Sequence, residues 1–154
     1  MTMTKDEALA GLRASHEEFA SRLNAFTPEG WAAPLPTGTW RVRDAAAHIA
    51  VWDRLLAESI RGLPSGRVPD WLSWDDAKTD EVNEQQVSNS AGWTLDRLRA
   101  ELRDARVEVL DAVAALDGAQ FAQSHRSGDV ETSAEGLCAY WIRHDRAHIG
   151  ELPS

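Results

Sequence analysis

The sequence predicts an all-α protein that folds as a four-helix bundle. Four separate stretches place apolar residues three and four positions apart, which is the spacing of an amphipathic helix. Each stretch begins near a residue that can cap a helix and is followed by a break, in most cases at glycine or proline. No alternation of β-branched and polar residues is long enough for a sheet, so we expect none. The chain of 154 residues has the length of one domain, and we expect a single domain over 1–154.

The first two predicted helices each carry a histidine on their apolar side. Thr4 and Glu7 form a capping box that opens the first helix, which ends before Pro28. Its seam consists of Leu9, Leu12, His16, Phe19, Leu23 and Phe26. After a proline-rich loop over 31–39, a second helix is expected from about residue 41 to residue 61. Its stripe consists of Ala45, His48, Ile49, Trp52, Leu55 and Leu56.

The second half of the chain predicts two more long helices. Thr94 is expected to cap the third, and a capping box of Thr132 and Glu135 is expected to open the fourth, with 119–131 as a loop. The stripe of the fourth helix consists of Leu137, Trp141, His144, His148 and Leu152. The connection between the second and third helices has about thirty residues and includes a short helix over 75–88, capped by Ser73. Such a crossover lets the second and third helices run parallel.

Composition excludes several classes of protein. The net charge of −9 makes nucleic-acid binding unlikely, because phosphates repel an acidic surface. The polar N-terminus and the lack of an 18-residue apolar run argue against secretion and membrane spanning. Cys138 is the single cysteine, which rules out an internal disulfide, and we expect it to be a buried apolar residue. We therefore expect a cytoplasmic protein.

Three histidines on two helices point to a metal site. His144 and His148 are four residues apart, so both rings lie on one helix face. His48 lies on the apolar stripe of the second helix. A neutral imidazole buried alone costs roughly 1–3 kcal/mol, and sharing a divalent cation would satisfy all three rings. The levels of His48 and His148 match if the second and fourth helices run antiparallel.

A plainer interpretation stays open for each of these histidines. An inward histidine is often a hydrogen-bonded core residue, and two histidines four apart occur by chance on helices. His16 lies on a seam with no histidine three or four positions away. It is either a structural histidine or a fourth group near the same cavity.

Acidic and aromatic neighbours extend the predicted site. Asp145 has two interpretations. In the first it accepts a hydrogen bond behind a metal ligand or acts as a weak general base. In the second, which we favour, it is a surface carboxylate paired with Arg146 or Arg41. Asp44 either orients the His48 ring or is a first-turn acid that stabilises its helix. Four aromatic residues are expected either to wall an apolar pocket over the metal or to pack in the core: Trp40, Trp52, Tyr140 and Trp141.

Two segments resemble the DinB/YfiT-like superfamily. The run Thr39-Trp-Arg-Val-Arg-Asp-Ala-Ala-Ala-His-Ile-Ala-Val-Trp52 is similar to the Trp-x-x-x-Asp-x-x-x-His stretch of that family. The segment His144-Asp-Arg-Ala-His-Ile-Gly-Glu-Leu152 is similar to its closing helix, and 80–85 resembles the crossover of some members. The likeness extends from about residue 5 to residue 152. Arg41 departs from the pattern, because serine is usual there.

The resemblance implies a fold, a cofactor and partners. Members of the family are four-helix bundles in up-down-down-up order, often homodimers, and three histidines bind zinc, nickel or iron. Those positions correspond here to His48, His144 and His148. Some relatives are thiol S-transferases or isomerases that use a low-molecular-weight thiol, and others, of the ClbS/DfsB type, are linked to resistance.

Two main functions follow for this chain. The first is a metal-dependent enzyme that acts on a small-molecule substrate, because three imidazoles leave a coordination position open. We lean to a thiol-dependent S-transferase acting on small electrophiles, on the resemblance alone, with a metal-dependent hydrolase as the runner-up. The second is a non-catalytic protein that binds a small molecule. A purely structural bundle is a third possibility and predicts no pocket near the histidines.

Overall fold

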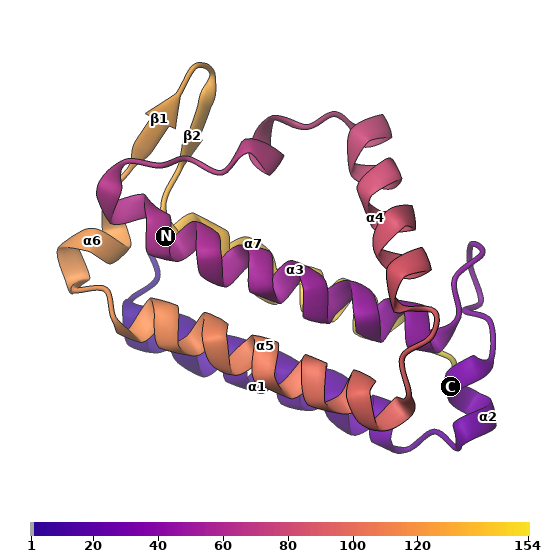
Figure 1. The fold of residues 1–154 in the computed structure, drawn as a ribbon. Coiled ribbons are helices and arrows are strands. Elements are labelled where there is room, and N and C mark those ends of the chain that lie inside the picture. Colours follow the sequence, from indigo (N-terminus) through magenta and orange to yellow (C-terminus); the bar gives the residue numbers. More distant parts are fainter. Residues whose placement is uncertain (1) are drawn as a thin grey trace.

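Four long helices run along the molecule in the computed structural model, which describes residues 2–154 (Figure 1). Their bounds are α1 (Lys5–Asn24), α3 (Val42–Gly62), α5 (Leu95–Ala114) and α7 (Ala134–Glu151). The predicted four-helix bundle is therefore confirmed. No helix within the described residues is both long and apolar enough to cross a membrane.

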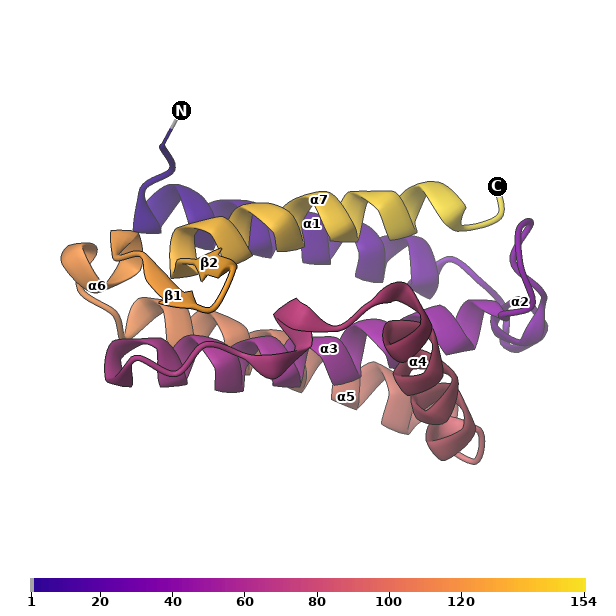
Figure 2. The same cartoon turned by 90° about the horizontal axis from the view of Figure 1, so that it is seen from above.

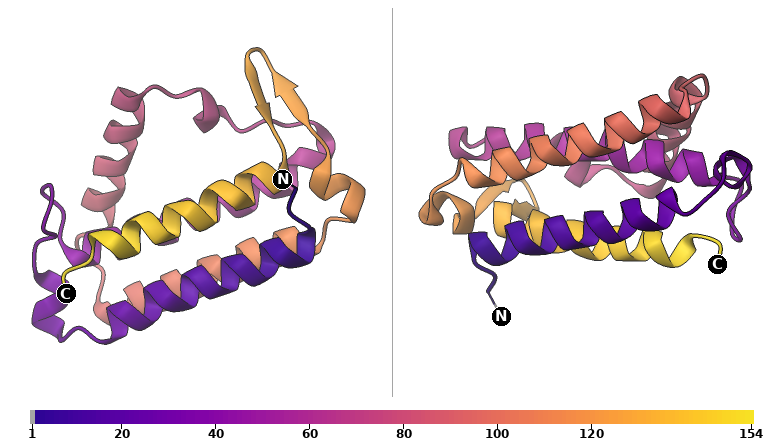
Figure 3. Two further views of the ribbon diagram at one scale, coloured as in Figure 1. Left: turned by 180° about the vertical axis from the view of Figure 1, so that it is seen from behind. Right: turned by 90° about the horizontal axis from the view of Figure 1, so that it is seen from below.

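The long helices form two pairs. Helix α3 lies beside α5, and α1 lies beside α7 (Figure 2). Helices α3 and α5 run in the same direction, opposite to α1 and α7, as both ends of the chain and the connections show (Figures 1 and 3). This is the up-down-down-up order. It places α3 antiparallel to α7, which is the condition that the histidine pattern required.

The crossover between α3 and α5 arches over one side of the bundle (Figure 1). It consists of two 3₁₀ turns, η1 (Leu63–Ser65) and η2 (Asp70–Ser73), and the helix α4 (Asp76–Ser90). The cap of α4 is Asp75, whose side chain accepts from the N–H of Lys78, and not Ser73. Ser73 belongs to the preceding turn, where its hydroxyl bonds to the carbonyl of Asp70.

Three short elements join the long helices at the two ends of the bundle. They are α2 (Pro28–Ala32), α6 (Gly118–Ala122) and an antiparallel hairpin of β1 (His125–Ser127) and β2 (Val130–Thr132). The expectation of no sheet and of a loop over 119–131 was wrong at this point. Gly128, with φ of +59°, makes the tight turn, and strands of three residues are too short to show a period in the sequence.

Helix caps follow the sequence in most places. The side chains of Thr4 and Thr94 accept hydrogen bonds from the first turns of α1 and α5, as expected. The cap of α7 is Ser133 and not Thr132, because Thr132 pairs with His125 in the hairpin. The chain thus leaves the hairpin and enters α7 without an intervening loop.

The core is formed by the predicted seams. Leu12, Phe19 and Leu23 of α1 are fully buried, as are Leu98 and Val109 of α5. Two apolar clusters fill the bundle, one toward the hairpin end and one toward α2. Burying each such side chain stabilises the fold by about 1.5–3 kcal/mol.

Candidate metal centre

Three histidines converge between α3 and α7. One ring nitrogen from each of His48, His144 and His148 lies within 4.8 Å of the other two. Ring centroids are 5.5 Å apart for His48 and His144, and 4.9 Å for His48 and His148. His48 is two turns into α3, and His148 is one turn from the end of α7. The antiparallel order brings these two levels together.

The chemistry of the three rings suits a cation. Burial, followed by the charges of His148 and His144, lowers the pKa of His48 to about 2. Burial also lowers the pKa of His144 to about 4. These two rings are therefore neutral near pH 7, which is the form that binds a metal.

Two features of the rings fit a shared ion. The Nε2 atoms of His144 and His148 face each other at 3.0 Å. Two nitrogens each bound at about 2.1 Å to one ion are separated by about 3.0–3.4 Å, so this spacing needs little adjustment. Nδ1 of His48 is buried and has no hydrogen-bond partner in the described part of the chain. Of these atoms only Nδ1 of His48 is unsatisfied, because the two Nε2 atoms are hydrogen-bond partners of each other. A divalent metal would supply a partner to the first and could take the place of the hydrogen bond between the other two.

Glu151 holds the ring of His148. Its Oε2 atom lies 3.0 Å from Nδ1 of His148. A hydrogen bond from Nδ1–H to this carboxylate leaves the lone pair on Nε2, the atom that faces His144. Glu151 is not among the site residues that the sequence predicts. The available signal was its position three residues after His148, one turn along the same helix face.

The two acids that the sequence predicted behind the ligands have other partners. Asp44 accepts hydrogen bonds from the backbone N–H and the guanidinium of Arg41, so it caps α3 and does not orient His48. Of its two predicted roles the first is therefore excluded, and Asp44 acts as the first-turn acid. Arg41 itself takes the cap position where serine was usual.

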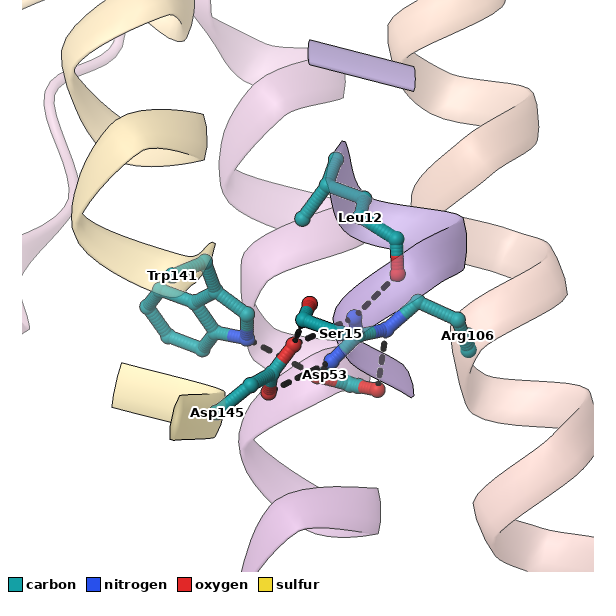
Figure 4. A network of polar contacts seen from close by, with 6 residues as sticks. All are labelled: Leu12, Ser15, Asp53, Arg106, Trp141 and Asp145. Atoms are coloured by element: carbon teal, nitrogen blue, oxygen red, sulfur yellow. Dashed lines mark hydrogen bonds and ion pairs between the residues drawn. The ribbon is translucent and has the colours of Figure 1, made fainter. Parts of the chain in front are cut away.

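Asp145 is not the surface carboxylate that we favoured. Its side chain is fully buried and forms an ion pair with Arg106 of α5 (Figure 4). Arg106 donates two hydrogen bonds to Asp145 and two to Asp53 of α3, at 2.8–3.0 Å. A further N–H bonds to the carbonyl of Leu12 in α1, so all five guanidinium donors are used.

Two more contacts complete this buried network. The hydroxyl of Ser15 in α1 donates to Asp145, and the indole N–H of Trp141 in α7 donates to Asp53 at 2.8 Å (Figure 4). The network therefore ties all four long helices together, and it includes the residue that follows His144 in the chain. Although burial opposes its charge, Asp53 and Asp145 raise the pKa of Arg106 above its ordinary value. Asp145 thus positions the turn that carries His144 without touching that ring.

A cavity of about 940 Å³ opens beside the histidines. All four aromatic residues expected to wall a pocket line it: Trp40, Trp52, Tyr140 and Trp141. The remaining walls come from the crossover, through Trp71, Leu72 and residues of α4, and from the segment between α6 and α7. A cavity of this size can hold a drug-sized molecule. The third possibility from the sequence, a purely structural bundle, predicts no cavity beside the histidines.

Aromatic rings pack directly on two of the three histidines, His48 and His144. The ring of Tyr140 stacks on His144 with an interplanar angle of 17° and a centroid distance of 5.9 Å. Trp40 lies 5.0 Å from His48. Tyr140 is half-exposed, which is unusual for a large side chain, and its exposed surface borders the cavity. These contacts fix the ring orientations from the cavity side.

His16 does not line the cavity and is not part of the cluster. Burial and the charge of Arg106 lower the pKa of His16 to about 4, against a smaller opposing effect of Asp145. Its Nδ1 atom is buried with no hydrogen-bond partner among residues 2–154. Of the two interpretations, the structural histidine is the one that this position supports.

A comparison with protein families matches residues 11–152 to the DinB superfamily. The chain belongs to the DinB superfamily. The match covers both the α3 segment with His48 and the α7 segment with the other two histidines, where the sequence resembled this family. A comparison with curated proteins finds no match.

Solved structures similar to this DinB protein confirm the fold. An uncharacterised protein from Escherichia coli UTI89 has a TM-score of 0.76 and 16% identity, over 99% of this chain and 94% of that one. A mycothiol-dependent maleylpyruvate isomerase has a TM-score of 0.79 and 12% identity, over 99% of this chain and 62% of that one. The colibactin self-resistance protein ClbS, solved with double-stranded DNA, has a TM-score of 0.79 and 12% identity, over 97% of this chain and 93% of that one.

Proposed function

We propose that this DinB protein is a metal-dependent enzyme that acts on a small molecule held in the cavity, and that His48, His144 and His148 hold the metal. The observation that carries the proposal is the approach of the three imidazoles to within 4.8 Å of one another, at the wall of a cavity of about 940 Å³. Three ligands leave one or more coordination positions for a reactant, as in catalytic metal sites.

The residues around the cluster have separate tasks in this proposal. Glu151 keeps the Nε2 atom of His148 free of its proton. Tyr140 and Trp40 pack on the imidazoles and limit their rotation. The indoles of the cavity exclude water from the bound molecule. A zinc, nickel or iron ion held there would supply a Lewis acid able to activate a thiol or a water.

Thiol-dependent S-transfer to a small electrophile is the reaction that we favour. Its support is the family together with the mycothiol-dependent isomerase among the similar structures. The thiol has to come from a co-substrate, because Cys138 is fully buried and burial raises the pKa of its thiol to about 12. Hydrolysis needs the same ion and no thiol, and it is the alternative reaction.

A non-catalytic binding role is the second candidate, and the size of the cavity favours it. The ClbS structure shows that a similar bundle is found in a self-resistance protein. In that case the cavity sequesters a compound and the metal is dispensable for binding.

Elemental analysis of untagged protein tests the metal. We expect close to one equivalent of a divalent metal in the wild type and a loss of most of it in His48→Ala and His144→Ala. The matched control is His125→Ala, which removes a histidine of the hairpin that lies outside the cluster. Metal-free wild-type protein that stays metal-free after incubation with zinc, nickel and iron would refute the metal site.

A second measurement separates catalysis from binding. Metal-loaded protein is incubated with low-molecular-weight thiols and electrophilic acceptors, and thioether formation is followed by mass spectrometry. Turnover that requires both thiol and metal supports S-transfer. Product formation from the acceptor and water without thiol supports hydrolysis, and binding of an acceptor with no turnover supports sequestration.

A further inference from the structure

The tryptophans of the cavity use their polar groups on the protein itself. Trp52, Trp71 and Trp141 line the space, and each indole N–H is already bonded. The acceptors are Oδ1 of Asn83 at 2.7 Å, Oγ of Ser59 at 3.0 Å and Oδ1 of Asp53 at 2.8 Å. What these indoles offer a bound molecule is therefore ring faces and edges, without a donor. Such a wall favours an apolar π surface over a sugar or a peptide.

The same three indoles form a corner, which we call the tryptophan corner. Trp52 and Trp71 meet at 82° with centroids 5.5 Å apart, and Trp71 and Trp141 meet at 64° and 5.8 Å. The third pair, Trp52 and Trp141, lies at 55° and 6.4 Å. Aromatic rings attract one another in offset-stacked and edge-to-face geometries. A flat ring placed in the corner can stack on one indole and meet the edge of another.

Arg143 is the one charged side chain in the cavity lining, within the described residues, that has no partner of opposite charge. Arg143 lines the cavity and is exposed, and within residues 2–154 its guanidinium has no ion pair or hydrogen bond. It lies 6.0 Å from the ring of Tyr140. The other charged side chain in the lining, Glu131, is bonded to Arg126 at 3.0 Å and to Ser124. The net charge of −9 is screened over about 8 Å at physiological ionic strength, so the near charge dominates.

We infer that the cavity binds a flat aromatic molecule with one anionic group, its ring in the tryptophan corner and its anion at Arg143. The inference rests on the proposed function in one respect, because it names the substrate class of the same cavity. It does not require the metal, since the corner and Arg143 are formed by the protein alone. Of the two reactants in the proposed S-transfer, the aromatic anion is the acceptor. The cavity selects this acceptor and not the thiol.

Calorimetric titration of chelator-treated protein tests the inference. The probes are naphthoate, naphthylmethanol, naphthylmethylammonium and octanoate, which vary the charge and the ring independently. We expect naphthoate to bind most tightly, roughly fivefold better than naphthylmethanol, with the ammonium compound and octanoate weaker still. The chelator prevents the carboxylate from binding to a metal instead of to Arg143.

Two variants assign the contacts. Arg143→Gln should reduce the preference for naphthoate over naphthylmethanol to about one, and Arg146→Gln, an exposed arginine of the same helix outside the cavity, should leave it unchanged. Trp71→Leu keeps the site apolar but removes one side of the corner, and it should weaken all naphthyl probes by about tenfold. Its folding is checked by circular dichroism.

Each part of the inference can fail separately. Equal binding of naphthoate and octanoate would overturn the aromatic selection, and equal binding of naphthoate and the ammonium compound would overturn the role of Arg143. If the purified protein contains its metal but the chelator-treated protein does not bind naphthoate, this inference is refuted and the proposed function stands. Tight naphthoate binding by a protein that never takes up metal would do the reverse.

Discussion

The three histidines of the cluster differ in what holds their rings. His148 is held by Glu151, His144 by the stacked ring of Tyr140, and His48 by burial between Trp40 and Trp52. Only His148 has a carboxylate that can set which ring nitrogen carries the proton. The affinity for a metal should therefore depend on a residue that does not touch the ion.

Replacing Glu151 with alanine should weaken metal binding by about tenfold. The carboxylate no longer fixes the tautomer of His148, so part of the population has its Nε2 atom protonated and unable to bind. The measurement is a competition titration with a chromophoric zinc chelator. Glu17→Ala, an exposed acid of α1, is the matched control for the loss of one negative charge. An unchanged zinc affinity in Glu151→Ala would contradict the orienting role.

His16 should make the protein less stable in acid. Its pKa is about 4 in the folded state and about 6.5 in the unfolded chain. Between these values the unfolded state binds a proton that the folded state does not, so stability that is present above about pH 6.5 is lost as the pH falls toward 4. The loss amounts to at most roughly 3 kcal/mol.

Urea unfolding at several pH values measures this effect. In His16→Leu, the difference in the free energy of unfolding between neutral and acidic pH should be smaller than in the wild type. His125→Leu shows how much any histidine replacement changes the profile. A parallel pH profile for His16→Leu and wild type would show that His16 does not carry the effect.

Among the α-helices, α4 has the smallest share of buried residues. Of its fifteen residues only Gln86 and Ser90 are buried, and its sequence has little apolar content. A hydrogen bond from Trp52 to Asn83 attaches α4 to α3. A second one, from Trp40 to Glu84, attaches α4 to the loop between α2 and α3. Both bonds come from tryptophans of the cavity wall. An element with so few buried contacts opens locally at low cost.

Hydrogen exchange should be faster in α4 than in α3 and α5. Asn83→Ala removes the acceptor of the Trp52 N–H, and it should speed exchange in α4 further, with a loss of about 1–2 kcal/mol in local stability. Asn89→Ala, an exposed residue of the same helix, should not. Mass spectrometry of exchanged peptides measures both. Equal protection of α4 and α5 would show that the crossover is held more firmly than its contacts indicate.

At the scale of the whole molecule, Arg106 of α5 bonds directly to all three other long helices, and through Asp53 it reaches Trp141. The network is fully buried and contains one guanidinium and two carboxyl groups. Removing one partner of a buried ion pair leaves uncompensated charge in a medium of low polarity. Its loss should therefore affect the whole bundle and not one helix.

Arg106→Met should lower the free energy of unfolding by about 3–5 kcal/mol. Adding Asp53→Asn and Asp145→Asn to this variant should restore part of the loss, because neutral amides tolerate burial better than carboxylates. Arg103→Met, an exposed arginine on α5, is the control and should change stability by less than about 1 kcal/mol. Chemical denaturation measures all three. A loss below about 1 kcal/mol in Arg106→Met would contradict the structural role of the network.

The local pattern of the chain was enough to predict the four long helices, their inward faces and the three histidines. The reason is that helix periodicity, caps and chain breakers act over a few residues. The same pattern made an antiparallel order of α3 and α7 the condition for a shared metal site, and the length of the crossover allowed that order. The pattern did not predict features shorter than one helical repeat. Both the hairpin of three-residue strands and the position of the last cap at Ser133 were missed for this reason.

Contacts between distant segments were decided by the tertiary structure alone. Asp145 and Arg106 are thirty-nine positions apart, and nothing in the neighbourhood of either residue says that the two will meet in the core. The cavity is likewise formed by α3, α7, the crossover and the segment between α6 and α7, so no single segment encodes it. Periodicity says which face of a helix is buried, but which residue lies opposite depends on the level and direction of the partner helix, and these are set by packing of the whole bundle.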